Sequence, residues 1–150
     1  MRIRHFTAGM VFFLILAGQC LAGYIDNGDG TITDTDTGLV WLNQTLGSMS
    51  FSQALNLCET GTWGNHNDWR LPDRNALQSI VDYSAYDPAI VHSVFAGTVS
   101  SGYWSSTINM SDPSRAWYVN FQNGVVSYNE AGTNYYVRPV RGGDRTMISA

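Results

Sequence analysis

The stretch YIDNGDGTITDTDTGLVWL, residues 24–42, carries the clearest local pattern in the chain. Two short runs rich in β-branched and aromatic residues lie on either side of Asn27-Gly28-Asp29-Gly30, and Thr37-Gly38 precedes a third run, Leu39–Leu42. Asn-Gly and Asp-Gly pairs readily adopt the positive φ angles that tight hairpins require. The stretch therefore predicts β-hairpins at the start of the folded domain.

Two amphipathic helices are predicted after these hairpins. Ser50 and Gln53 have the spacing of a capping box, and apolar residues then recur with the helical period as far as Cys58. Asp73 follows a Leu-Pro pair and predicts the N-cap of a second helix that runs to about Asp82. We expect Cys58 to be a small buried hydrophobe, because no cation lies beside it in the sequence to lower the pKa of its thiol.

Strand patterns return in the last third of the chain, around an Asn123-Gly124 turn. The predicted strands are Tyr103–Thr107, Ala116–Phe121, Val125–Tyr128 and Tyr135–Arg141. Strands that flank a helical block, instead of alternating with helices, are typical of an α+β fold with a largely antiparallel sheet. The sequence shows no repeat and no linker, so residues 23–150 are predicted to form a single domain.

The first 22 residues have the proportions of a secretory signal peptide. A basic head with Arg2 and Arg4 precedes the uncharged run Ala8–Gly18, which is too short for a membrane span of about 20 residues. Cleavage after Ala22 would leave Cys58 as the one cysteine of the mature chain. Lipidation of Cys20 is the alternative, although Gln19 stands where a lipoprotein signal has a small residue. In both cases the protein is exported, to the periplasm, to an outer-membrane-associated position or to the medium.

The charge balance argues against nucleic acid as a partner. The 150 residues include 8 basic side chains, all arginine, against 12 acidic ones. Without the two arginines of the signal segment, the net charge is about −6. Binding to phosphate backbones needs clustered cations, which this chain lacks. A hydrophobic content of 44% with five tryptophans supports a packed core.

Five ordered blocks resemble the Lcl C-terminal domain family, a bacterial family long catalogued as a domain of unknown function. They read DNGDGT with TGLVW, DWRLP, YWSST, AWYVNF and YVRPVR, at residues 26–31 with 37–41, 68–72, 103–107, 116–121 and 136–141. The resemblance implies a C-type-lectin-like fold, related to that of formylglycine-generating enzymes. In that fold two helices flank a twisted, largely antiparallel sheet and long loops form a binding face.

The roles that this resemblance implies are binding roles. The best-understood members of the family are surface adhesins for sulfated glycans, and related folds serve as variable binding proteins. Sulfate recognition requires a basic patch, which an acidic chain without lysine does not provide. The formylglycine-generating relatives are oxidases that use a pair of cysteines, so a single mature cysteine argues against inherited catalysis.

Metal and hydrolytic sites find little support in the sequence. Four aspartates between Asp26 and Asp36 suggest Ca²⁺, but their spacing does not match an EF-hand, and hairpin turns explain the same residues. A structural Ca²⁺ is kept as the alternative, and otherwise no cofactor is expected. Two histidines, His66 and His92, follow the signal segment, and neither lies in a zinc motif. No Gly-x-Ser-x-Gly motif is present.

Candidate ligand-binding residues come from loops rich in Trp, Tyr, Asn and Ser, which are typical of adaptable binding surfaces. Two tryptophans in a Gly/Asn-rich loop would either order that loop or stack on a ligand, and the remaining residues border two C-terminal loops. The full set is Trp63, Trp69, Asn109, Asp112, Arg115, Tyr128, Asn129, Asn134 and Tyr135.

These patterns favour an exported, non-catalytic, adhesin-like module that recognises a carbohydrate or protein at the bacterial surface or in the periplasm through its C-terminal loops. The alternative is a structural or assembly subunit of an envelope complex, in which an aromatic surface packs on a partner chain or on a second copy. An oxidase or hydrolase on the same fold is a minor alternative.

Overall fold

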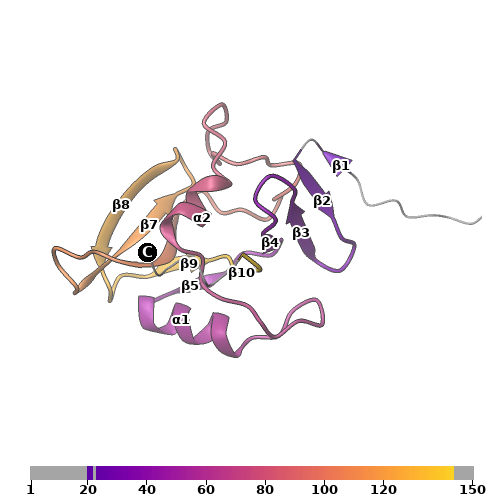
Figure 1. Cartoon of the computed structure of the whole chain (residues 1–150). Helices are drawn as coiled ribbons and strands as arrows, with labels where there is room; N and C mark the ends of the chain where they lie inside the picture. The colour runs from indigo at the N-terminus through magenta and orange to yellow at the C-terminus, as the bar shows by residue number, and fades with distance from the viewer. Residues whose placement is uncertain (1–19, 22, 144–150) are drawn as a thin grey trace, which may run out of the picture.

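Figure 1 shows the computed structural model of the chain, which describes residues 20–21 and 23–143. Of the predicted signal segment, residues 1–22, Cys20–Leu21 lies inside the described part and the rest lies outside it. No helix of the described part is long and apolar enough to cross a membrane. The elements are β1 Cys20–Leu21, β2 Tyr24–Asp26, β3 Thr31–Asp34, β4 Val40–Leu42, β5 Leu46–Met49, α1 Phe51–Thr60, α2 Arg74–Ser79, β6 Gly102–Ile108, β7 Arg115–Asn120, β8 Val125–Glu130, β9 Tyr135–Val137 and β10 Val140–Arg141.

The described strands form two five-stranded sheets. The first has the order β1-β2-β3-β4-β10, and all its neighbouring strands are antiparallel. The second has the order β5-β9-β6-β7-β8, in which β6 and β9 are parallel and the other neighbours are antiparallel. The predicted α+β class is therefore confirmed, but the strands divide between two sheets where one was expected.

The predicted N-terminal hairpins are present as β2, β3 and β4. Gly28 and Gly30 have φ angles of 75° and 85°, in the left-handed region that glycine reaches without a steric penalty. Asp26 Oδ1 accepts a hydrogen bond from Gly28 N at 2.9 Å. Asp34 Oδ1 accepts one from Asp36 N, also at 2.9 Å. These contacts support the interpretation of the acidic residues as turn residues.

The first helix, α1, begins where the capping-box spacing predicted. Ser50 N donates a hydrogen bond to Gln53 Oε1 at 3.0 Å, which satisfies a backbone group that the first turn leaves unpaired. The side chains that this helix buries recur with the helical period and are Phe51, Ala54 and Cys58. The expectation that Cys58 is a buried helical residue is confirmed.

The second helix, α2, is shorter than the sequence predicted. Asp73 Oδ1 accepts a hydrogen bond from Ala76 N at 2.8 Å and caps the helix as expected. The helix ends at Ser79, not near Asp82. Asp82 Oδ1 instead accepts hydrogen bonds from the N and Oγ atoms of Ser84, at 2.9 and 2.6 Å, which stabilise a turn.

Two hydrophobic clusters lie on opposite faces of the second sheet. Consecutive residues of a strand point to opposite faces, so Tyr103 and Trp104 of β6 belong to different clusters. Tyr103 lies in the cluster that contains Leu77 of α2, whereas Trp104 lies in the cluster that contains Phe51 of α1. Figure 1 shows the two helices on opposite sides of β5 and β9. Each helix therefore covers one face of this sheet.

The predicted strand Tyr135–Arg141 is in fact two strands that belong to different sheets. The strand β9 lies in the second sheet and β10 lies in the first, with Arg138 and Pro139 between them. Proline has no N–H to donate to a strand ladder, so the strand is interrupted here. The strands β1 and β5 were not predicted. The sequence of β5, Leu-Gly-Ser-Met, has little strand propensity, and this segment pairs with β9.

Arg138 is fully buried, with 0% of its surface exposed, at the point where the chain passes between the sheets. Its Nη1 atom donates hydrogen bonds to the carbonyl oxygens of Leu42, at 2.9 Å, and of Asn43. Its Nη2 atom donates to the hydroxyl groups of Thr45 and Thr98, at 3.0 and 2.8 Å. One side chain thus joins the segment after β4 to the loop before β6.

The charge of this guanidinium is stabilised by dipoles and ring faces. The Phe95 and Tyr103 ring centroids lie 5.0 and 5.9 Å from Arg138 Cζ. None of the ion pairs found among the described residues includes Arg138. Burial lowers the pKa of Arg138 to about 10, so its side chain is still positively charged at neutral pH.

Replacing Arg138 by methionine is expected to lower the free energy of unfolding by about 3–5 kcal/mol, because two carbonyl groups and two hydroxyl groups lose a buried donor. Urea unfolding followed by circular dichroism measures this loss. The control is Arg141→Met, which removes a partly exposed pair with Asp68 and should cost about 0–1 kcal/mol. Equal losses in the two variants would contradict the structural role given to Arg138.

Cys58 is expected to be chemically inert in the folded protein. Burial raises the pKa of its thiol to about 12, so at pH 8 the side chain is neutral as well as covered. Alkylation of Cys58 by iodoacetamide at pH 8 should be slower in native buffer than in urea by on the order of 100-fold. Mass spectrometry of the Cys58 peptide measures the two rates, and rapid labelling of the native protein would contradict the expectation.

Candidate functional site

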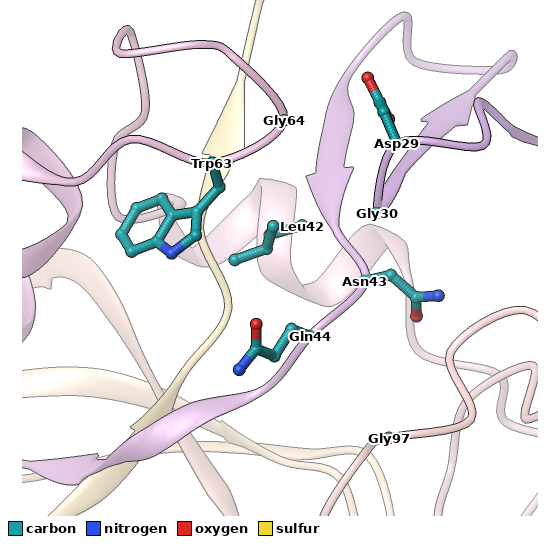
Figure 2. Close-up of a pocket in the computed structure, with 8 residues that line it drawn as sticks. All are labelled: Asp29, Gly30, Leu42, Asn43, Gln44, Trp63, Gly64 and Gly97. Carbon is teal, nitrogen blue, oxygen red and sulfur yellow. The ribbon is translucent and has the colours of Figure 1, made fainter.

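A cavity of about 400 Å³ lies where four segments of the chain meet. The segments are the β2–β3 turn, the residues that follow β4, the loop after α1 and the loop before β6. Its lining residues are Asp29, Gly30, Leu42, Asn43, Gln44, Trp63, Gly64 and Gly97. In Figure 2, Trp63 and Gln44 lie on one side, and Asp29 and Asn43 lie on the other. The volume is within the range of sites for small ligands.

The β2–β3 turn contributes a carboxylate to this cavity. Asp29 Oδ1 accepts hydrogen bonds from Thr31 N at 3.0 Å and from Thr31 Oγ1 at 2.5 Å. The bond from the Thr31 hydroxyl holds the pKa of Asp29 below its usual range. Asn43 N donates to Gly30 O at 2.9 Å and fixes the turn to the neighbouring wall. The carboxylate is thus ionised and held in place.

Trp69 orders the loop that carries Trp63. The Trp69 indole Nε1 donates to the carbonyl oxygens of Trp63, at 3.1 Å, and His66, at 3.0 Å, and the two indole rings lie edge to face at 6.1 Å. Trp69 is 1% exposed, so it offers no ring face to a ligand. This corrects the prediction of Trp69 as a contact residue. Trp63 is half-buried and lines the cavity.

Gly61 fixes the position of the Trp63 ring from behind. A Cβ atom on Gly61 would lie 1.9 Å from the Trp63 ring, so any larger residue would displace the indole. The backbone of Gly61, with a φ of −75°, is one that any residue adopts. Close contact with the ring, not backbone conformation, therefore explains the requirement for glycine.

Gly61→Ala is expected to shift the Trp63 indole and to lower the free energy of unfolding by about 1–3 kcal/mol through overpacking. Near-ultraviolet circular dichroism and urea unfolding report the two effects. The control is Gly47→Ala, since a Cβ at Gly47 would meet no atom within 4 Å. An unchanged tryptophan spectrum in Gly61→Ala would contradict the proposed contact.

Two amide side chains follow β4 on the cavity wall. Arg138 holds the carbonyl oxygen of Asn43, and this bond fixes the backbone of that wall. Asn43 Oδ1 is buried and has no hydrogen-bond partner in the described part of the chain. This oxygen has almost no surface open to solvent, so a ligand would reach it only after a turn of the Asn43 side chain. Gln44 is exposed and offers both a donor and an acceptor.

Three of the residues predicted in the C-terminal third lie together on β7, β8 and the loop that precedes β7. Arg115 Nε lies 2.8 Å from Glu130 Oε1 and 3.3 Å from Asp112 Oδ2. Tyr128 pairs with Trp117 across the two strands, with ring centroids 5.1 Å apart, and is 42% exposed. The charged groups of this surface thus bind one another.

Asn129, Asn134 and Tyr135 lie apart from this group, whereas Asn109 is joined to it by backbone hydrogen bonds with Asp112 and Arg115. Asn129 Nδ2 donates to Tyr135 Oη at 3.0 Å, on the opposite face of the sheet from Tyr128. Asn109 is 8% exposed, and its Oδ1 accepts a hydrogen bond from Ser111 N at 3.0 Å, so its side chain orders the loop. Asn134 is exposed in the turn before β9. The predicted C-terminal residues therefore do not form one surface.

Most of the cavity was missed at the sequence level. Of its lining residues, Trp63 was named as a ligand contact, and Asp29 was weighed as a Ca²⁺ ligand or turn residue. A usable signal exists in Asn43-Gln44-Thr45, three polar residues that directly follow the buried end of β4. Polar residues that follow a buried strand are candidates for a site, since the strand fixes their backbone.

Comparison with protein families gives a match to the model described as the Lcl C-terminal domain. The matched residues are 30–141, which include every lining residue of the cavity except Asp29. This match confirms the resemblance seen in the five sequence blocks. Comparison with curated proteins gives no match.

Proposed function

We propose a function for this chain from the premise that it belongs to the Lcl C-terminal domain family, as the family match shows. The protein is an exported, non-catalytic binding module, adhesin-like in its role and C-type-lectin-like in its fold. It recognises carbohydrate, and the sugar binds in the cavity between the β2–β3 turn and the Trp63 loop. The predicted signal segment supports export to the periplasm or the cell surface.

The chemistry of the cavity lining carries this proposal. A sugar presents hydroxyl groups, which both donate and accept hydrogen bonds, and an apolar face of C–H groups. Asn43 and Gln44 offer amide donors and acceptors, Asp29 offers a strong acceptor, and Trp63 offers ring surface. The half-buried Trp63 ring, the exposed Gln44 amide and the exposed Asp29 carboxylate are the features that a ligand can reach directly.

The site in this proposal differs from the C-terminal loops favoured by the sequence. In the C-terminal group, Arg115 is engaged by two carboxylates, so a ligand would have to break existing ion pairs. The cavity offers groups whose hydrogen-bonding capacity is still free, on walls that internal hydrogen bonds already hold. Binding to preformed walls costs less conformational entropy than ordering a loop.

Trp63→Ala and Gln44→Ala are expected to weaken binding on a glycan array by at least about 10-fold and about 3-fold, through loss of ring contact and of an exposed amide. The protein is applied with Ca²⁺ and again with chelator. Tyr128→Ala is the control, because it removes an exposed aromatic ring that lies outside the cavity. Its binding should match that of the unmodified protein.

Normal binding by Trp63→Ala together with loss in Tyr128→Ala would move the site back to the C-terminal strands. Loss of binding in chelator would support the structural Ca²⁺ alternative. No binding to any glycan would contradict the proposal and favour an assembly subunit of an envelope complex. The exposed rings of Tyr83 and Tyr86 are the observation that favours this second candidate.

A further inference from the structure

Asp29 gives the cavity its charge. It is the one ionisable side chain among the lining residues. Its Oδ1 is engaged by Thr31, whereas Oδ2 takes part in no hydrogen bond of the described part of the chain. The Thr31 hydroxyl keeps the pKa of Asp29 below its usual range, so the carboxylate is ionised at physiological pH. A ligand in the cavity therefore meets a fixed negative charge.

The positive charges nearest to this carboxylate do not line the cavity. Arg138 lies behind the Asn43 wall, but it is fully buried and donates to protein oxygens. Arg141 and His66 interact electrostatically with Asp29. Arg141, however, donates to both carboxylate oxygens of Asp68, at 2.7 and 3.0 Å. No cationic side chain lines the cavity to bind an anionic group.

We infer that the cavity accepts an uncharged sugar unit and that Asp29 selects against sugars that carry a carboxylate or sulfate group. The inference rests on the proposed function, because it concerns the ligand of the same cavity. A neutral sugar can donate a hydroxyl hydrogen bond to the free Asp29 oxygen, and a bond to a charged acceptor is stronger than a neutral one. An anionic sugar instead brings two like charges close together, which is unfavourable.

The test compares sugars that differ in one charged group. The pairs on the array are glucose and glucuronic acid, and galactose and galactose 6-sulfate, each presented on the same linker. The unmodified protein should bind the neutral member of each pair at least about 10-fold more tightly. Asp29→Asn should reduce this ratio at least about fivefold, because asparagine keeps an Oδ1 acceptor for Thr31 but carries no charge.

Asp26→Asn is the matched control. It changes the net charge by the same amount on the same turn, and Asn can still accept the hydrogen bond from Gly28 N. Asp26 does not line the cavity, so the ratio between neutral and anionic sugars should stay as in the unmodified protein. The comparison separates a local effect of Asp29 from the overall charge of the domain.

The outcomes distinguish this inference from the proposed function. Equal or tighter binding of the anionic sugars by the unmodified protein would overturn the inference and leave carbohydrate binding intact. The role of Asp29 would be overturned if Asp29→Asn left the ratio between neutral and anionic sugar binding unchanged. It would also be overturned if Asp26→Asn changed this ratio by the same amount. Absence of binding to every sugar would overturn the proposed function and this inference together.

Discussion

The buried guanidinium of Arg138 is the constraint on which the two sheets and the cavity depend. It lies between β9 and β10, where the chain leaves one sheet for the other, and it donates hydrogen bonds to the residues after β4 and to the loop before β6. The same segments form two walls of the cavity. A fully buried cation is stable only while the oxygen atoms that accept its hydrogen bonds stay close to it. These walls therefore have little freedom to move apart.

Tyr103 extends this constraint into the core. Its hydroxyl group lies 3.0 Å from Thr45 Oγ1 and accepts a hydrogen bond from Val99 N at 2.9 Å, while its ring packs against Phe121. The polar network of Arg138 is thereby attached to the hydrophobic cluster beneath α2. On the opposite wall, Trp69 holds the Trp63 loop in place, because its indole N–H donates to the carbonyl oxygens of Trp63 and His66. Internal hydrogen bonds thus hold the walls of the cavity, and the proposed binding function would benefit because a preformed site costs less conformational entropy to occupy.

Local signals in the sequence were sufficient for the turns and caps. The capping function of Asp73, the helical period that ends in Cys58 and the Asn-Gly turns all depend on neighbouring residues, and all appear in the structure. The pairing of strands that lie far apart in the sequence could not be predicted from neighbouring residues. The strand β5 pairs with β9 although its sequence has little strand propensity, and the two parts of Tyr135–Arg141 that Pro139 separates join different sheets.

The candidate site shows the same division between local and long-range information. The lining residues of the cavity come from separate parts of the chain, as Asp29, Asn43, Trp63 and Gly97 show. No sequence motif therefore indicates the cavity. Trp69 and Asn109 were attractive candidates because loops are commonly exposed, but hydrogen bonds to the surrounding backbone hold both side chains inside. Whether a polar or aromatic loop residue faces solvent is decided by tertiary contacts, which a single sequence does not reveal.

The most direct test of the central claim is a nuclear magnetic resonance titration of ¹⁵N-labelled protein with neutral oligosaccharides. We expect saturable shifts of the Trp63 indole N–H and the side-chain amides of Asn43 and Gln44, with the resonances of Tyr128 and Arg115 unchanged. Shifts confined to the Tyr128 and Arg115 strands, or no shift at any concentration of sugar, would contradict carbohydrate binding in this cavity.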